Sequence, residues 1–412
     1  MNGFVSTDCD RMMTASQRRP TGLTGELLGK TLGYARERDY TGWDYGDGMS
    51  SRLLQALPVD NKWVNIAIQE TIKRAPVNVR PLFLVEQRRN YKGTAMFTMA
   101  NLAAHELDLD ESSGVDYGRE AHDLAEWLVE ERTPGYAGFC GAHRHEIQHL
   151  DIKGLPSYPD MVSTAYAVRA LLAAHDAGLD TGTVDYAETV RSVADFIDED
   201  LEYEEIDDGA RMKYVPTWSS EHYTLNAVAL GGVTLLELGA RFGGEHRERG
   251  EKLLDYVVSC QRPEGGWMYR DPPSASHLSM DNHHNGFIIE SLLRHRELTG
   301  ADRYAGVLDD ALAFYREELF ADDGAPNWDE SNSYPRDINA AAQGIIVFSR
   351  AGEFAAAERI IDWVLGTLYA GDGKFRFRRE RFFTRRVTLM RWCEAAMAYA
   401  LATYLDQRAS SA

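Results

Sequence analysis

The sequence predicts an all-α fold, a single (α/α)6 toroid in which six inner helices are surrounded by an outer ring. Two observations carry this prediction: six segments share one character, and the links between successive helices alternate between short and long. Internal repetition of helical pairs is typical of repeat architectures, because each pair buries its apolar face only against its neighbours. An open solenoid of helix pairs, used for protein binding, is the alternative.

Each repeated segment opens with polar or aromatic residues and continues as an apolar helix rich in Ala and Gly. A helix that is apolar on all sides is typically buried on all sides, as an inner ring requires. The six segments are 90–107, 160–177, 222–240, 282–298, 337–350 and 389–405.

A more amphipathic helix follows each of the first five segments, with apolar residues on one face and charges on the other. These predicted outer helices are 116–131, 186–200, 246–261, 304–319 and 353–369. No outer helix follows residue 405, so we expect the helix over 62–74 to close the ring. We divide the chain into a partly flexible N-terminal extension, 1–40, and the toroid domain, 41–412.

Long loops lead from each outer helix to the next inner helix, at 132–159, 201–221, 262–281, 320–336 and 370–388. They therefore gather at the end where the inner helices begin, which we call the mouth. Long loops on a rigid scaffold often carry binding and catalytic residues. Helix N-termini also favour anions. The mouth is therefore the predicted site.

Composition narrows the ligands and the compartment. With 44 basic and 64 acidic residues the net charge is −20, which argues against a nucleic-acid partner. An anionic ligand would need a local basic pocket. The cysteines, Cys9, Cys140, Cys260 and Cys393, form no CxxC pair, so neither a zinc cage nor a disulfide framework is indicated. Without a membrane-length apolar run or a signal-peptide pattern, we expect a cytoplasmic protein.

Acids, imidazoles and guanidiniums collect at the predicted mouth. A Gly-rich loop and the openings of the inner helices supply Asp44, Asp47, Arg80, His143, His145, His149, Asp281, His283, His284, Tyr334, Arg336, Asp337, Arg385, Arg386 and Arg391, with Trp43, Trp267 and Trp328 nearby.

Several of these residues have an ordinary structural explanation. Asp281 and Asp337 stand at N-cap positions, so capping explains them as well as catalysis does. Asp44 and Asp47 are equally suited to shaping a turn. The three histidines of loop 132–159 lack a matching ligand set, which favours a solvated loop over a metal site. We therefore predict neither a metal nor a cofactor.

Two further features have competing interpretations. The basic run 376–386 fits either a surface hairpin or an anion-binding wall, and in so acidic a chain we favour the wall. Trp267 follows a helix-ending turn and serves either core packing or sugar stacking.

Seven sequence blocks, spread over about residues 40–405, resemble the AglQ-like family of archaeal N-glycosylation and surface-polysaccharide proteins. The blocks are GWDYGDGMSS, VNVRPLF, NYKGTAMF, DNHHNGF, FYREELFADDGAPNW, YPRDINAAAQ and MRWCEAAMAYAL. That family is distantly similar to toroid sugar enzymes, including unsaturated glucuronyl hydrolases, glucuronyl C5-epimerases and N-acylglucosamine 2-epimerases. The resemblance implies a role in N-glycan assembly and S-layer biogenesis of a haloarchaeal cell, and it transfers no catalytic residue.

Our leading hypothesis is an isomerase or epimerase acting on a uronate-type sugar, free or linked to a nucleotide or lipid. Inversion beside a carboxylate needs a base, an acid and a cation for the developing charge. The hypothesis assigns proton transfer to His283, His284 and Tyr334, with Asp281 and Asp337 orienting an imidazole or binding hydroxyls. It assigns the carboxylate to Arg80, Arg336 and Arg391, and the remaining substrate contacts to Asp44, Asp47, Trp267 and Trp328.

Two alternatives stay open. A glycoside hydrolase would use two of Asp44, Asp281 and Asp337 as its acid and base. A non-catalytic glycan-binding assembly protein would stack sugars on Trp43, Trp267 and Trp328. A lipid-linked substrate would also bring the chain into peripheral contact with membrane-bound glycan machinery.

Overall fold

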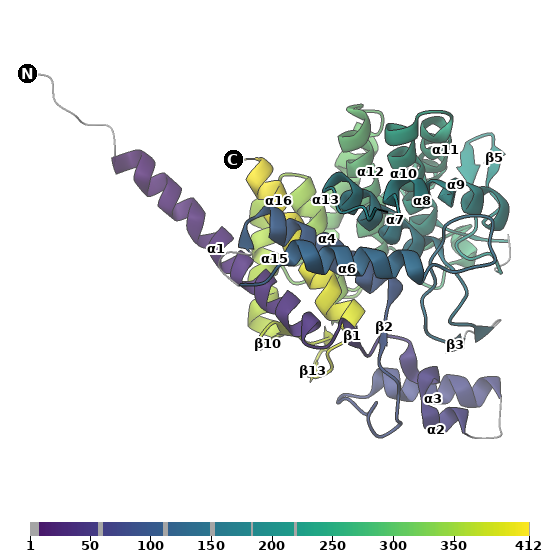
Figure 1. The fold of residues 1–412 in the computed structure, drawn as a ribbon, viewed down its shortest axis with the longest axis horizontal. Coiled ribbons are helices and arrows are strands. Elements are labelled where there is room, and N and C mark those ends of the chain that lie inside the picture. The colour runs from purple at the N-terminus through teal and green to yellow at the C-terminus, as the bar shows by residue number, and fades with distance from the viewer. Residues whose placement is uncertain are drawn as a thin grey trace, which may run out of the picture.

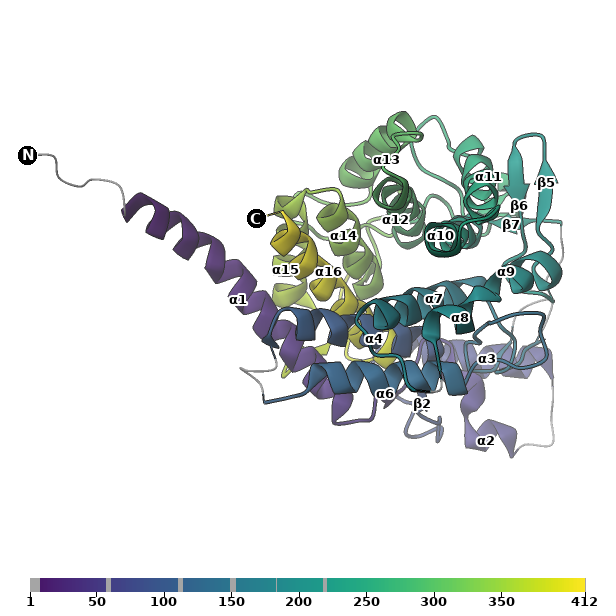
Figure 2. The same ribbon diagram turned by 45° about the horizontal axis from the view of Figure 1, so that its top comes forward.

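The structure is a computed structural model that describes residues 8–56, 61–109, 114–148, 153–182, 184–217 and 221–411, with side chains from residue 22 onward. Its framework is a closed ring of six inner helices, each in contact with the next and the last in contact with the first (Figure 2). They are α4 (Tyr91–Glu106), α7 (Met161–Asp176), α10 (Leu225–Phe242), α12 (Asn282–Thr299), α14 (Ile338–Arg350) and α16 (Ala396–Ser410), the last continuing the π-helical η4 (Met390–Ala395). The predicted (α/α)6 toroid is confirmed, and the open solenoid is excluded.

The outer ring lies around these helices (Figure 1). It contains α6 (Tyr117–Glu130), α8 (Tyr186–Arg191), α9 (Val193–Asp195) with η2 (Phe196–Asp200), α11 (His246–Ser259), α13 (Ala305–Glu318) and α15 (Phe354–Thr367). The helices α6, α8, α11, α13 and α15 pack on α4, α7, α10, α12 and α14, respectively. Each long helical pair therefore follows the order expected from the repeats.

The ring is closed by a different helix from the one predicted. α1 (Asp8–Arg36) packs on α16 and α4, and Leu28 and Leu32 are completely buried there. α3 (Lys62–Arg74) instead packs on η1 (Asp47–Ser50) and on β3 (Ile147–Gln148) at the mouth. The prediction for 62–74 was wrong because an amphipathic pattern shows that one face is covered, but not what covers it. The division of the chain at residue 41 stays a prediction.

Polar side chains fix where the inner helices begin. Asn90, Asp160 and Asp281 each accept a hydrogen bond from the backbone N–H three residues later, and Asp337 accepts one two residues later. Such caps are each worth about 1 kcal/mol, because they satisfy donors that the helix itself leaves free. They align the four helix starts with the mouth.

Short antiparallel strand pairs brace the mouth loops, together with α2 (Arg52–Gln55) and η3 (Pro273–Ala275). The pairs are β1 (Thr41–Gly42) with β2 (Arg88–Arg89), β3 with β4 (Lys153–Gly154), β5 (Glu204–Ile206) with β6 (Gly209–Arg211), β7 (Tyr223–Thr224) with β8 (Arg270–Asp271), β10 (Tyr369–Gly371) with β11 (Lys374–Phe375), and β12 (Arg378–Arg379) with both β9 (Arg336–Asp337) and β13 (Thr384–Arg385). The link from α14 to α15, in contrast, is 351–353. The predicted loop asymmetry is confirmed.

An aromatic layer crosses the centre of the ring. It consists of Tyr166 from α7, Phe287 from α12 and Tyr399 from α16, which are alternate inner helices. The Tyr166 ring centroid lies 6.1 Å from that of Phe287 and 5.9 Å from that of Tyr399, and all three side chains are buried. The layer separates the mouth from a cavity at the opposite end, which we call the lower cavity.

One described helix, α10, is long and apolar enough to cross a membrane, but 78% of that stretch is buried inside the protein. Its apolar character is explained by its place in the inner ring.

Candidate active site at the mouth

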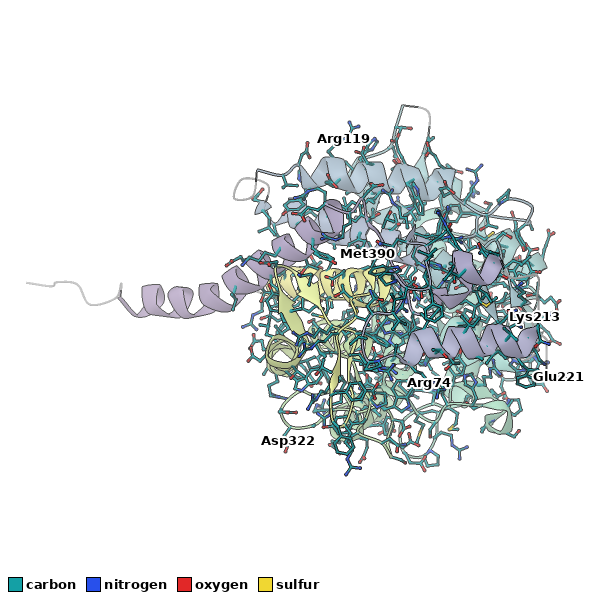
Figure 3. All side chains as sticks on the ribbon, turned by 90° about the horizontal axis from the view of Figure 1, so that it is seen from below. Arg74, Arg119, Lys213, Glu221, Asp322 and Met390 are labelled. Carbon is teal, nitrogen blue, oxygen red and sulfur yellow. The ribbon has the colours of Figure 1, made fainter. Side chains whose placement is uncertain are left out.

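The mouth face combines inner-helix starts with the segment 41–90. Figure 3 shows this face, with α3 lying across it up to Arg74 and Met390 at the start of the last inner helix. Side chains from regions far apart in sequence meet beneath it.

Arg391 anchors one wall of the mouth. Its Nε and Nη2 donate to the Asp44 carboxylate at 2.7–3.1 Å, and Nη2 lies 3.2 Å from His143 Nε2. Although burial opposes it, the charge of Arg391 holds the pKa of Asp44 well below its usual range. The predicted clamp is therefore already occupied by a protein carboxylate.

Two histidines of loop 132–159, His143 and His145, pack into the wall rather than into solvent, contrary to our expectation. Burial, reinforced by Arg391, lowers the pKa of His143 to about 3. Burial also lowers the pKa of His145 to about 4, although Asp44, whose Oδ2 lies 4.0 Å from His145 Nε2, opposes the shift. Both imidazoles are thus neutral near pH 7 and belong to the wall. His149 lies outside the described residues.

Arg80 and Asp47 form a second buried ion pair, at 2.8 Å. Arg80 also donates to the Asp44 backbone carbonyl at 3.0 Å, and the Asp44 N–H donates to Asp47 at 3.0 Å. Burial raises the pKa of Asp47 to about 6 although Arg80 opposes the shift. These contacts fit the turn-shaping alternative, and they leave Arg80 engaged rather than free to hold a substrate carboxylate.

Asp281 and His284 form a carboxylate–imidazole pair at the start of α12. His284 Nδ1 lies 2.8 and 2.9 Å from the two Asp281 oxygens, and the same carboxylate caps the helix through the His284 N–H. Asp281 therefore both caps the helix and orients the His284 imidazole. Among the described residues none forms a hydrogen bond with His284 Nε2. A carboxylate on Nδ1 fixes the tautomer that leaves Nε2 free to accept a proton.

His283 lies between the dyad and the opposite wall. Its ring centroid is 4.5 Å from Phe287 and 5.7 Å from Trp392, whose indole lies 5.1 Å from the Arg391 guanidinium. His283 Nδ1 is buried and has no partner in the described part of the chain. Burial, followed by the charges of His284 and Lys92, holds the pKa of His283 well below its usual range.

Lys92 was missed by the sequence interpretation. It lies in the first turn of α4, is 5% exposed, and places its ammonium 4.4 and 4.5 Å from the Tyr166 and Phe287 ring centroids. None of the described residues accepts a hydrogen bond from it. Burial, with a contribution from Arg391, lowers the pKa of Lys92 to about 7. Of the eight lysines in the sequence, this one alone is buried.

Asp160 was also missed. It caps α7, is 5% exposed, and accepts hydrogen bonds at 2.7 Å from the N–H and Oγ of Ser163. Burial raises its pKa, whereas nearby Lys92 opposes the shift. An acid with a raised pKa and a base with a lowered pKa are thus neighbours. Perturbed pKa values of this kind, in neighbouring groups, mark a candidate functional site.

Asp337 has the capping role rather than the predicted catalytic one. It accepts hydrogen bonds from Asn339 N–H, from Trp392 Nε1 and from two nitrogens of Arg378. Both carboxylate oxygens are therefore occupied. Arg378 also covers Trp328, at 5.1 Å from its ring centroid.

The basic run 376–386 forms the β12–β13 hairpin, and two of its arginines form internal ion pairs. Arg378 pairs with Asp337, and Arg385 pairs with Glu380. Arg381 and Arg386 are exposed and form no ion pair with a described residue. The hairpin is therefore present, and the anion-binding wall stays a prediction.

Three predicted site residues lie elsewhere. Trp267 is 1% exposed and donates its Nε1 hydrogen to the Val257 carbonyl at 2.7 Å, so it packs in the core and cannot stack on a sugar. Tyr334 is 39% exposed, and Arg336 lies 5.2 Å from its ring centroid and 3.8 Å from Asp323. No contact among the described residues joins this pair to His284 or Lys92.

Comparisons with known proteins bear on the fold. No family model matches the sequence, and neither does any curated protein. A cellobiose 2-epimerase from Bacillus thermoamylovorans superimposes with a TM-score of 0.59 and 16% identity, over 77% of this chain and 88% of that one. An unsaturated glucuronyl hydrolase specific for heparin gives 0.60 and 13% over 95% and 97%, and a D-mannose isomerase gives 0.57 and 9% over 78% and 88%. The chain has the α/α toroid of these sugar enzymes. Identities this low extend the likeness to the fold alone.

Proposed function

We propose that this chain is a sugar isomerase or epimerase that acts on a uronate-type sugar during assembly of an N-linked or surface glycan. The observation that carries the proposal is the combination at the mouth of the Asp281–His284 pair with Lys92, a buried amine that forms no ion pair with a described carboxylate. The fold neighbours support sugar processing in general, because they include epimerases, an isomerase and glycoside hydrolases.

In the proposed reaction His284 Nε2 removes the proton from the carbon beside the sugar carboxylate. The C–H electron pair moves into an enediolate, and Asp281 stabilises the imidazolium that forms. Lys92 balances the new negative charge. A bound carboxylate raises the pKa of a nearby amine, so the anionic substrate itself favours the ammonium form of Lys92. The buried carboxyl of Asp160 is the proton donor for the opposite face.

Hydrolysis is the second candidate. The glucuronyl hydrolase match extends over nearly the whole of both chains, and the raised pKa of Asp160 suits a general acid. We rank it lower because Asp281, Asp44 and Asp337, the carboxylates expected to act as its partner, are each engaged by a histidine or arginine.

Deuterium exchange separates the two reactions. The protein is incubated in deuterated water with nucleotide-linked and lipid-linked uronates, which follow from the proposed cytoplasmic, membrane-adjacent role. We expect the sugar to gain one deuterium while its glycosidic bond stays intact. A new reducing end without deuterium would establish hydrolysis, and no change in any uronate would favour a glycan-binding assembly protein.

Two variants connect exchange to the site. His284→Gln and Lys92→Met should each abolish deuterium uptake. Lys252→Met is the matched control and should exchange at the wild-type rate, because Lys252 lies on the outer helix α11 and pairs with Glu205 and Glu248. Exchange that survives His284→Gln would exclude His284 as the base.

A further inference from the structure

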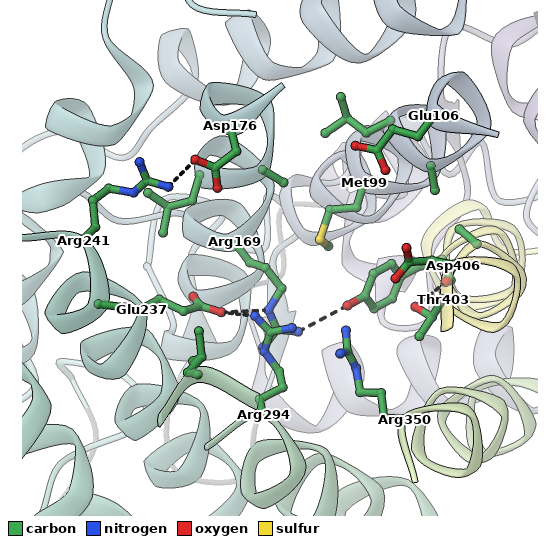
Figure 4. A pocket seen from close by; sticks show the side chains of 18 residues that line it. Met99, Glu106, Arg169, Asp176, Glu237, Arg241, Arg294, Arg350, Thr403 and Asp406 are labelled. Atoms are coloured by element: carbon green, nitrogen blue, oxygen red, sulfur yellow. Dashed lines mark hydrogen bonds and ion pairs between the residues drawn. The ribbon is translucent and has the colours of Figure 1, made fainter. Parts of the chain in front are cut away.

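The lower cavity has a volume of about 620 Å³ and opens at the end where the inner helices finish (Figure 4). Its side walls are apolar and include Leu102, Leu172 and Leu298, whereas its inner end is charged. A volume of this size is in the range of small-molecule sites, about 300–1,000 Å³. The aromatic layer separates it from the mouth, so its occupant would be distinct from the proposed substrate.

Three arginines, from α7, α12 and α14, converge at the inner end. Arg169 donates to Glu290 at 2.9 Å and to Glu237 at 3.4 Å, and Arg294 pairs with Glu237 as well (Figure 4). Arg350 lies 3.9 Å from Glu290. Arg350 also pairs with Glu297 at 2.8 Å, so three guanidiniums face three carboxylates. Burial, followed by the charge of Arg169, lowers the pKa of Arg294, whereas Tyr399, Glu297 and Glu290 raise the pKa of Arg350 against the effect of its burial.

Two donors in this cluster have no acceptor. The Nε groups of Arg294 and Arg350 are buried and form no hydrogen bond within the described ranges, although the Arg350 side chain is 10% exposed and lines the cavity. Leaving a buried donor unpaired is unfavourable by about 1–3 kcal/mol. An anion bound at these two guanidiniums would supply the acceptors that the described residues do not provide.

The rim limits what kind of anion enters. Exposed Glu106 and Asp406 stand at the opening and repel each other strongly enough that Asp406, after burial, raises the pKa of Glu106. They disfavour polyanions. We infer that the lower cavity binds a small organic anion whose single carboxylate or phosphate group lies on Arg294 and Arg350. Arginine forks grip either group bidentately, and the apolar walls accommodate an uncharged body.

Calorimetry of the full chain tests this inference, with inorganic phosphate and acetate as probes at constant ionic strength. We expect one binding event that persists in Lys92→Met and weakens at least tenfold in Arg350→Gln and Arg294→Gln. Arg241→Gln is the matched control, because Arg241 lies at the rim and pairs with Asp176. A preference for one probe identifies the head group.

A steric variant keeps the test decisive if the arginine variants do not fold. Ala173 lines the wall and carries no charge, so Ala173→Phe should fill the cavity and abolish binding while leaving the ion pairs intact. Binding that is lost in Lys92→Met but retained in the Arg350, Arg294 and Ala173 variants would place the anion at the mouth and overturn the inference. Absence of binding for both probes would also overturn it, and neither result bears on deuterium exchange.

Discussion

Replacing Lys92 by Met should stabilise the protein while abolishing its activity. The pKa of Lys92 is about 7 in the fold against an ordinary value of 10.5. Between these values the unfolded chain binds a proton that the folded chain lacks, so protonation favours unfolding. The stability of the wild type therefore rises with pH across this window, by about 1.4 kcal/mol for each pH unit. Methionine retains the apolar length of the side chain and removes the titration.

Urea unfolding of both proteins at several pH values measures the effect. The titration predicts that Lys92→Met is more stable by about 4 kcal/mol at pH 7 and by about 2 kcal/mol at pH 9. The difference between the two proteins cancels the titrating groups that do not interact with Lys92. A stability difference that does not change between pH 7 and pH 9 would refute the reasoning, because Lys92 would then keep its proton in the fold.

Three further variants test the mouth. Asp281→Asn should lower the exchange rate by a factor of about 10²–10⁴. The weaker cap should lower the unfolding free energy by only about 1 kcal/mol. A loss of stability with an unchanged exchange rate would indicate a purely structural residue. Asp44→Asn should lower the unfolding free energy by about 3–5 kcal/mol at pH 7, because Arg391 stays buried without its carboxylate. This difference should shrink below about pH 4, where unfolded Asp44 also binds a proton; a constant difference would contradict it. Gly141→Ala would place a Cβ 2.0 Å from the Tyr91 ring, so we expect a loss of about 1–3 kcal/mol by urea titration, and an unchanged midpoint would be inconsistent with this packing.

The architecture was predictable because two independent patterns indicate it: the repeated composition of the helices and the alternation of short and long loops. The ring-closing helix was not, since α1 and α3 both show one apolar face and only tertiary contact distinguishes them. The caps at Asp281 and Asp337 were also predictable. Asp281 pairs with a histidine, whereas Asp337 is engaged by Arg378 and Trp392. This difference was not predictable, because Arg378 and Trp392 lie about 40 residues or more from Asp337 along the chain.

The sequence gives only a weak indication that Lys92, His143 and His145 belong to the site. Lys92 stands in NYKGTAMF, where nearly every neighbour is apolar or small. A lysine inside a fully buried segment indicates a functional site or a paired charge, because burial of an unpaired charge is unfavourable. His143 and His145 gave no such signal, since burial of a loop depends on the segment 41–90 that covers it.

The aromatic layer lies between the mouth and the lower cavity, because Lys92 contacts Tyr166 and Phe287 from one side and Arg169 contacts Tyr166 and Tyr399 from the other. The three aromatic side chains are buried and fill the ring at this level. On the proposed function, a sugar at Lys92 would therefore approach and leave through the mouth alone. The proposed reaction then predicts action on a chain terminus or a single sugar unit rather than along the interior of a long glycan.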